Sequence, residues 1–427
     1  MKGTTVAVPF HYKKEKIMFK RTALIFSLVI LLTGCMPSPI SRNNIHSVNR
    51  AMISRSLTNT GNTDRLNNIF EKARDGKKIT IAFLSSSAFI EDEGNTSTVT
   101  ETVEKLKELL GKKSNIEVVK LCVAGSTSRF GNIMLEKKIL PKNPDLVVLD
   151  YAVFDKHEQE EREAFESIIR TCIEQENEPQ VIIFLNSKSD SNAKQDFMEQ
   201  IARYYNLPII NAANALFPEI SSGRMKKEEI FIDPLNYTEQ GRKAIASYFT
   251  NYFRTAIKTK DIKYTMPIPM YPNSVDKDIK LIDAGNIHAD NDGSFVREKN
   301  DNEFFKTKIK YLKNTQNMPF EFSIGANDIC LIVPTSQLRS EIAEIYIDGE
   351  KKTEINTKGD TLFDAPQAFK IYSNNNLDSV KIEIKVKEIS ETAEKQEVSE
   401  GNDVILPTPK KDFEFWGIAY DIKKTKK

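Results

Sequence analysis

The sequence predicts an α/β domain built on a parallel sheet, followed by an antiparallel β-sandwich or jelly-roll-like domain. In the first half, near-continuous Val/Ile/Leu runs alternate with amphipathic helices. This pattern is typical of a parallel sheet covered by helices on both faces, which makes three layers. In the second half, apolar and polar residues alternate in short runs, as in half-buried strands. Three prolines, Pro267, Pro269 and Pro272, separate the two patterns.

Composition excludes several classes of protein. The chain has 427 residues, with 61 basic and 60 acidic side chains. This balance argues against a nucleic-acid-binding protein. A mean hydropathy of -0.42 argues against multiple membrane spans. The spacing of Cys122, Cys172 and Cys330 matches no metal site, and the sequence has no dinucleotide or P-loop motif, so we expect no metal and no cofactor.

A targeting segment precedes the predicted domains. Basic residues within 13–21 come before an apolar run at 23–32, which is too short to span a bilayer, and Leu32-Thr33-Gly34-Cys35 ends the segment. It resembles a bacterial lipoprotein signal peptide over residues 1–34, with the true start at Met1 or Met18. Acyl chains on Cys35 would then hold the protein at the extracytoplasmic face of the cell membrane. An uncleaved anchor is the alternative.

The α/β domain is expected over residues 58–257, after a polar tether at residues 35–57. Apolar runs predict strands at residues 79–84, 116–123, 145–153, 181–185 and 208–210. Apolar residues on one helical face predict helices that start at Asp64 and end at Gly76, and that cover residues 101–110, 160–174, 193–205 and 238–256. Ligands of such sheets bind beyond the carboxyl ends of the strands, so we expect the chemistry in the loops that follow them.

The β domain is expected over residues 258–427. Alternating runs predict strands at residues 320–324, 342–347, 380–386 and 413–418. The dipeptide Asp348-Gly349 predicts a hairpin turn, because both residues tolerate a positive φ. Residues 388–411 are rich in Glu, Lys, Ser and Pro, which indicates a long exposed loop.

Polar blocks follow three of the predicted strands, and a fourth block precedes the last helix. They are Ser85-Ser86-Ser87, Ala124-Gly125-Ser126, Tyr151-Ala152-Val153-Phe154-Asp155 and Asp233-Pro234-Leu235-Asn236, with Gly241 in register behind the fourth. In this order, from about Asn59 to Ala256, the blocks resemble the SGNH/GDSL hydrolase superfamily. They look closest to the branch with a Gly-Gly-Ser-Ile-Thr first block and a trailing β domain, whose members are often carbohydrate esterases.

The resemblance implies a serine esterase mechanism with an incomplete set of groups. Ser87 matches the family nucleophile, Gly125 matches an oxyanion-binding Gly, and Asp233 matches the triad Asp. Phe154 stands where the family has its oxyanion-binding Asn, and Asn236 stands where it has its His base. Losing the base of a serine triad costs on the order of 10⁶ in rate, and losing an oxyanion donor costs ~10²–10³. We therefore expect weak or absent ester hydrolysis, with partial recovery in an Asn236→His variant.

One histidine offers an alternative base. His157 is the only histidine in the predicted α/β domain and follows the third strand, so it could approach Ser87 from another direction; otherwise it is a solvated loop residue. Three functions remain open. They are a divergent esterase acting on an acylated polysaccharide or envelope glycan, a non-catalytic glycan- or protein-binding lipoprotein, and an assembly lipoprotein whose β domain does the work. The sequence fixes neither a substrate nor an oligomeric state.

Overall fold

A computed structural model describes the chain from residue 50 to residue 422, with gaps. The described residues are 50–90, 97–111, 114–187, 196–233, 235–259, 264–274, 278–313, 315–374, 377–387 and 412–422. Cys35, the predicted signal peptide and most of the predicted tether lie outside them, as does the predicted loop at 388–411. Within these ranges, none of the helices combines the length and the apolar character that a membrane crossing requires.

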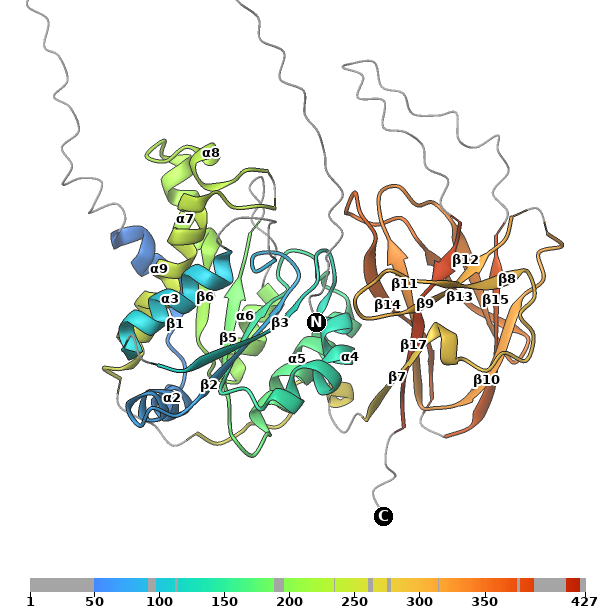
Figure 1. Ribbon diagram of the computed structural model, residues 1–427, viewed down its shortest axis with the longest axis horizontal. Coiled ribbons are helices and arrows are strands. Elements are labelled where there is room, and N and C mark those ends of the chain that lie inside the picture. The colour runs from blue at the N-terminus through green and yellow to red at the C-terminus, as the bar shows by residue number, and fades with distance from the viewer. Residues whose placement is uncertain are drawn as a thin grey trace, which may run out of the picture. The chain divides into compact units, whose positions relative to one another are not determined.

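A six-stranded sheet forms the centre of the first domain (Figure 1). Its strands are β1 (Leu57–Asn59), β2 (Ile79–Ser85), β3 (Ile116–Cys122), β4 (Leu146–Asp150), β5 (Gln180–Leu185) and β6 (Ile209–Asn211). The strand order is β1-β6-β5-β4-β2-β3. Strands β2 to β6 run parallel, and β1 pairs antiparallel with β6 at the edge. The carboxyl ends of five strands therefore meet at one edge.

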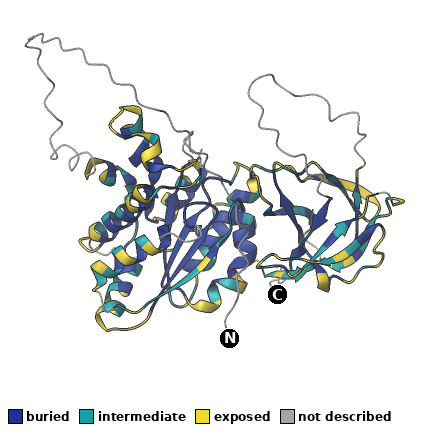
Figure 2. Cartoon of the chain, turned by 45° about the horizontal axis from the view of Figure 1, so that its top comes forward, coloured by how far each residue is buried: buried dark blue, intermediate teal, exposed yellow. Residues whose placement is uncertain are grey.

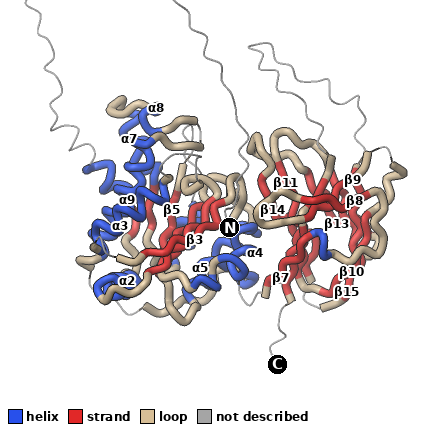
Figure 3. Tube along the Cα trace, in the orientation of Figure 1, coloured by secondary structure: helices blue, strands red, loops and turns tan. Residues whose placement is uncertain are grey.

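Helices cover both faces of this sheet, as Figure 3 shows by colour. Their bounds are α2 (Asp64–Arg74), α3 (Thr98–Leu110), α4 (Ser128–Lys138), α5 (Gln159–Ile173), α6 (Asp196–Tyr204), α7 (Ala212–Ser221), α8 (Lys227–Ile230) and α9 (Glu239–Ala256). One apolar core joins the sheet to α2, α3, α7 and α9, and a second joins its other face to α4, α5 and α6. The inner strands β2, β4, β5 and β6 are buried on both sides (Figure 2), whereas the edge strands β1 and β3 are only partly buried. The predicted three-layer α/β domain is confirmed.

The second domain consists of antiparallel sheets, which confirms the predicted class. Its strands are β7 (Ile279–Asp283), β8 (Phe295–Lys299), β9 (Thr307–Tyr311), β10 (Phe320–Gly325), β11 (Asp328–Thr335), β12 (Ile342–Ile347), β13 (Glu350–Asn356), β14 (Ala365–Ser373), β15 (Ser379–Val386), β16 (Glu414–Phe415) and β17 (Gly417–Asp421). They form the sheets β10-β15-β12-β13, β14-β11-β17-β7 and β16-β9-β8 around one apolar core. The predicted hairpin joins β12 to β13, with φ of 51° at Asp348 and 82° at Gly349.

The two domains share apolar and polar contacts. The ring of Phe130 on α4 lies 6.3 Å from that of Phe305, and Phe305 lies 6.1 Å from Trp416. The buried carboxylate of Glu166 on α5 accepts hydrogen bonds from the backbone N–H groups of Met270 and Tyr271, at 2.6 and 2.8 Å. The proline-bearing linker is therefore fastened to the α/β domain.

Three local predictions differ from the structure. Residues 50–56, read as part of the tether, are helical, and β1 follows them directly; Met52 is buried in the core. Helix α4 was not predicted, because its first residues read as a polar loop. Strand β4 ends at Asp150 rather than at 153, since the N–H groups of Phe154 and Asp155 both bond back to the carbonyl of Tyr151 and form a turn.

Candidate functional site

Ser87 lies at the carboxyl end of β2 in a buried network of polar side chains. Its hydroxyl accepts a hydrogen bond from Asn186 Nδ2 at 2.8 Å and lies 3.2 Å from the Asp150 Oδ2 that it can donate to. The Tyr237 hydroxyl donates to Asn186 Oδ1. Asn186 directly follows β5, and Tyr237 precedes α9. Three strand ends and one loop thus supply four linked side chains, and Ser87 itself is only 9% exposed.

Asp150 accepts most of the hydrogen bonds in this network. It is completely buried, and its Oδ2 also accepts from Ser85 Oγ at 2.6 Å and from the Ala88 N–H at 2.8 Å. Burial raises the pKa of Asp150 to about 6, while the hydrogen bonds from Ser85, Ala88 and Ser87 act in the opposite direction. The charged form is therefore held by donors from the same turn that carries Ser87.

The backbone donors that the resemblance implies for an oxyanion are bonded within the chain. The Ser87 N–H donates to Ser85 Oγ at 3.1 Å, and the Gly125 N–H donates to the Ser86 carbonyl at 3.1 Å. The carbonyl of Gly125 accepts from Gln367 Nε2 at 2.6 Å. Phe154, which the resemblance matches to an oxyanion-binding Asn, is buried and brings no side-chain donor. An oxyanion hole at Ser87 would require these bonds to break.

Asp233 and Asn236 are bonded to each other at the surface. Asn236 Nδ2 donates to Asp233 Oδ2 at 2.7 Å, and the Leu235 and Asn236 N–H groups donate to Oδ1 at 2.9 Å. Burial raises the pKa of Asp233, but the hydrogen bonds from Asn236 and Leu235 outweigh it, and the net pKa is lowered. No hydrogen bond among the described residues joins either side chain to Ser87.

His157 is exposed and lies against helix α6. Its ring packs edge-on against Phe197 with 5.6 Å between centroids, and its carbonyl accepts from Arg162 Nε at 3.3 Å. Within the described ranges, the structure gives it no hydrogen bond to Ser87. His157, the alternative base, is therefore packed against Phe197 and is not bonded to Ser87 in the described structure.

A polar cleft of about 440 Å³ lies beside Gly125 and Phe154. It is lined by Gly125, Thr127, Arg129, Phe154, Lys156, Glu158, Glu161, Thr335, Glu354, Asn356, Lys358, Gly359, Asp360, Thr361, Gln367, Ala368 and Phe369. Both domains contribute to its walls. Two predicted site residues therefore line this cleft, whereas Ser87, Asp233 and Asn236 do not.

Three residues of the site were not singled out from the sequence. Asp150 and Asn186 are the last residue of β4 and the first residue after β5, so the rule that chemistry follows the strands pointed to their neighbourhood. Tyr237 adjoins Asn236, but nothing in the sequence shows that it turns inward. Where the chain is described, no cluster of three or more His, Cys, Asp or Glu side chains has the arrangement of a metal site.

Comparison with known proteins identifies the fold. No protein-family model and no curated protein matches the chain. Among solved structures, it is similar to a two-domain esterase active on acetylated mannans, which was also crystallised with mannopentaose. The identity is 20% in both cases, with TM-scores of 0.71 and 0.70, covering 87% and 88% of this chain and 99% of the esterase. Both domains of the predicted fold therefore occur in one known protein.

Proposed function

We propose that the chain is a lipid-anchored, glycan-binding protein of the bacterial cell envelope, built on a two-domain esterase fold, that has lost ester hydrolysis. The observation that carries this proposal is the state of the groups around Ser87. The Ser87 and Gly125 N–H groups are bonded within the chain, and Phe154 and Asn236 replace the remaining donor and the base. A serine hydroxyl without a base is a weak nucleophile.

The glycan part of the proposal is supported by the fold and by the cleft. Solved structures similar to this chain include those of an esterase active on acetylated mannans, which was co-crystallised with mannopentaose in one of them. A cleft of about 440 Å³ is within the ~300–1,000 Å³ typical of ligand sites. The loss of catalytic groups need not remove the binding surface, because most of the residues that line the cleft are outside the catalytic set.

The location rests on the sequence alone. A basic segment, an apolar core and Leu32-Thr33-Gly34-Cys35 support acylation of Cys35. One or two acyl chains would anchor the protein at the extracytoplasmic membrane face. Membrane partitioning of the wild type, compared with a Cys35→Ser variant, tests this: equal membrane binding by both would contradict the anchor.

A chromogenic acetyl ester tests the catalytic part. We expect the wild type and Ser87→Ala to hydrolyse it at the same rate, close to the uncatalysed background. A wild-type rate like that of active esterases, abolished by Ser87→Ala, would overturn the proposal.

A second candidate function is a weak esterase with Asp150 as the base, which the 3.2 Å separation from Ser87 Oγ favours. It predicts a small Ser87-dependent rate that Asp150→Asn removes.

Restoring the family residues tests why activity is lost. Because Ser87 Oγ is already bonded to Asn186 and Asp150, we expect Asn236→His with Phe154→Asn to gain less than about tenfold, a smaller recovery than the sequence suggests. An increase of several orders of magnitude would mean that the network around Ser87 opens readily. Glycan binding is tested separately, by calorimetric titration with mannopentaose, xylopentaose and cellopentaose, and binding to none of the three would contradict it.

A further inference from the structure

We propose that the cleft beside Gly125 is a binding site for a neutral oligosaccharide, and that Arg129 and Glu161 are the side chains that bind its hydroxyl groups. This inference rests on the proposed glycan-binding function and assigns it a place. Ser87 is not among the residues that line this cleft, and both domains contribute to its walls.

Glu161 provides the first argument, because it is a buried carboxylate whose hydrogen-bonding capacity is not fully used. It lines the cleft from α5 and is only 4% exposed, yet its Oε2 has no hydrogen-bond partner among the described residues. Buried carboxylate oxygens are normally hydrogen-bonded, so this oxygen has acceptor capacity that it can offer to a ligand. Burial raises the pKa of Glu161 to about 7, with Arg129 acting in the opposite direction, so that near neutral pH the carboxyl can both donate and accept.

Arg129 provides the second argument. It stands in the first turn of α4, and its side chain is 15% exposed. Its Nη1 lies 3.8 Å from Glu161 Oε1, which is an ion-pair distance but too long for a hydrogen bond. The guanidinium and the carboxyl therefore stand side by side at the cleft with donors and acceptors to offer. Vicinal hydroxyl groups of a sugar match such a pair, since each hydroxyl donates and accepts.

The charge of the cleft favours a neutral ligand. Cationic and anionic side chains both line it, namely Arg129, Lys156, Lys358, Glu158, Glu161, Glu354 and Asp360. Neither sign dominates, so a uronate or phosphate would meet carboxylates as well as cations. Uncharged polar groups such as Asn356, Gln367 and Thr361 complete a lining suited to hydroxyl groups, while Phe154 and Phe369 add apolar surface.

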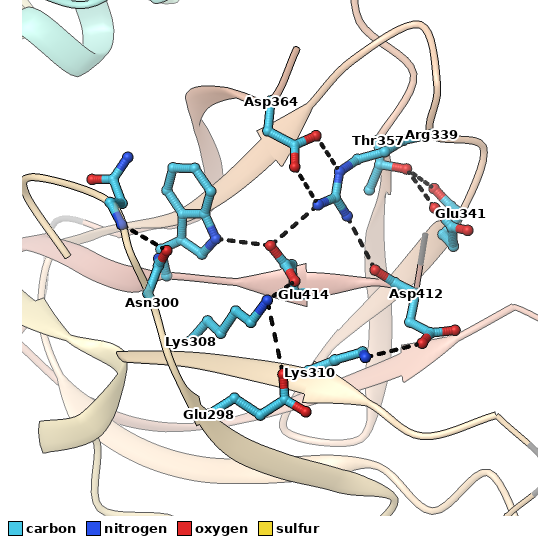
Figure 4. Close-up of polar contacts among 12 residues, drawn as sticks. Glu298, Asn300, Lys308, Lys310, Arg339, Glu341, Thr357, Asp364, Asp412 and Glu414 are labelled. Atoms are coloured by element: carbon cyan, nitrogen blue, oxygen red, sulfur yellow. Dashed lines mark hydrogen bonds and ion pairs between the residues drawn. The ribbon is translucent and has the colours of Figure 1, made fainter. Parts of the chain in front are cut away.

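The β-domain wall of the cleft is held by a buried ion-pair network (Figure 4). Arg339 donates to both carboxylate oxygens of Asp364, at 2.8 and 2.9 Å, and to Glu414 Oε1 at 3.1 Å. Its side chain is 2% exposed. Asp364 ends the loop that brings Gly359, Asp360 and Thr361 to the cleft. Arg339 is therefore a positioning residue for this wall and does not line the cleft itself.

Calorimetric titration with mannopentaose, xylopentaose and cellopentaose tests the site. We expect Arg129→Met and Glu161→Met each to weaken binding by about tenfold or more, because each removes hydrogen bonds to the ligand while keeping a side chain of similar length. Lys358→Ala, at an exposed position on the opposite wall, should weaken binding by a few fold and is not expected to disturb folding. Ser87→Ala and the surface control Glu239→Gln should bind like the wild type.

The outcomes separate this inference from the function on which it rests. If the wild type binds and the Arg129, Glu161 and Lys358 variants bind equally well, the cleft assignment is wrong while glycan binding stands. If Ser87→Ala alone loses binding, the ligand sits at Ser87 instead. If the wild type binds none of the three oligosaccharides, the proposed function and this inference both fail. Circular dichroism of each variant shows whether a loss of binding reflects a loss of fold.

Discussion

Two groups of buried polar side chains near the same sheet edge differ in how their hydrogen bonds are satisfied. Around Ser87, the chain bonds its own donors and acceptors: Asp150 accepts from three groups, and Asn186 is bonded on both sides. In the cleft, Glu161 Oε2 has no hydrogen-bond partner within the described part of the chain, and Arg129 Nη1 lies 3.8 Å from Glu161 Oε1, beyond hydrogen-bond distance. A group already satisfied gains little from a ligand, whereas an unsatisfied one gains a full interaction. The comparison therefore favours the cleft, rather than the surroundings of Ser87, as the place where a ligand binds.

The largest difference between the two regions is expected in stability. Asp150→Leu leaves the Ser85 and Ser87 hydroxyls and the Ala88 N–H without their acceptor, so we expect the free energy of unfolding to fall by about 3–5 kcal/mol. Glu161→Met removes a carboxyl whose Oε2 has no hydrogen-bond partner among the residues described, and it should change stability by no more than about 1 kcal/mol. Urea unfolding of both variants measures the contrast, and equal losses would remove the distinction between the two regions.

A pH series sharpens the same comparison. Because the folded state raises the pKa of Asp150 from 3.8 to about 6, it holds this proton more tightly than the unfolded chain does. The contribution of Asp150 to stability is therefore fully present below about pH 4 and falls as the pH rises to about 6, by up to about 3 kcal/mol. The pKa of Glu161 is raised from 4.5 to about 7, so its contribution to stability should be lost at a higher pH than that of Asp150.

Unfolding measured from pH 4 to pH 8 separates the two groups. As the pH is raised from 4, Asp150→Asn should gain stability relative to the wild type until about pH 6 and then remain level. Glu161→Gln should go on gaining stability relative to the wild type until about pH 7. Wild-type and variant curves that stay parallel throughout would show that neither carboxyl titrates as its burial implies.

A smaller effect is expected at Gly125, where the two regions meet. Its φ is +74°, and a Cβ there would lie 2.7 Å from Thr361 Cγ2 and 2.8 Å from Ala365 Cβ. We expect Gly125→Ala to lower the free energy of unfolding by about 2–3 kcal/mol, through backbone strain and displacement of the cleft wall. The control is Gly223→Ala, with φ of +70° and open space around it, which should cost about 1 kcal/mol. Equal losses of stability in the two variants would mean that Thr361 and Ala365 do not restrict the space around Gly125.

Periodicity was sufficient for most of the architecture. The apolar runs of β2 and β5 and the helical faces of α2 and α9 are local signals, and the structure has these elements within a few residues of the prediction. Helix α4 was missed because its apolar face, around Phe130, is buried partly against the second domain, which local sequence does not reveal. The first strands of the β domain are short and mixed in polarity, so they give little periodic signal.

The candidate site was only partly accessible from sequence. The family resemblance identified Ser87, Gly125, Asp233 and Asn236 as candidate site residues. It did not show that Asn186 from another strand end bonds Ser87, because that contact spans 99 positions in the chain. The role of Asp150 depends on complete burial, and that of Glu161 on the second domain closing the cleft, and both are properties of the fold.

Labelling with a fluorophosphonate tests the central claim most directly, because this reagent reacts with activated serine nucleophiles without needing a particular acyl substrate. The Ser87 hydroxyl is bonded to Asn186 and Asp150, and Asp150 is the only base that contacts it among the residues the structure describes. Ser87 should therefore form no adduct detectable by intact-protein mass spectrometry after prolonged incubation. An active serine esterase treated in parallel provides the positive control. A stoichiometric adduct on Ser87, absent from Ser87→Ala, would contradict the account and make Ser87 a working nucleophile.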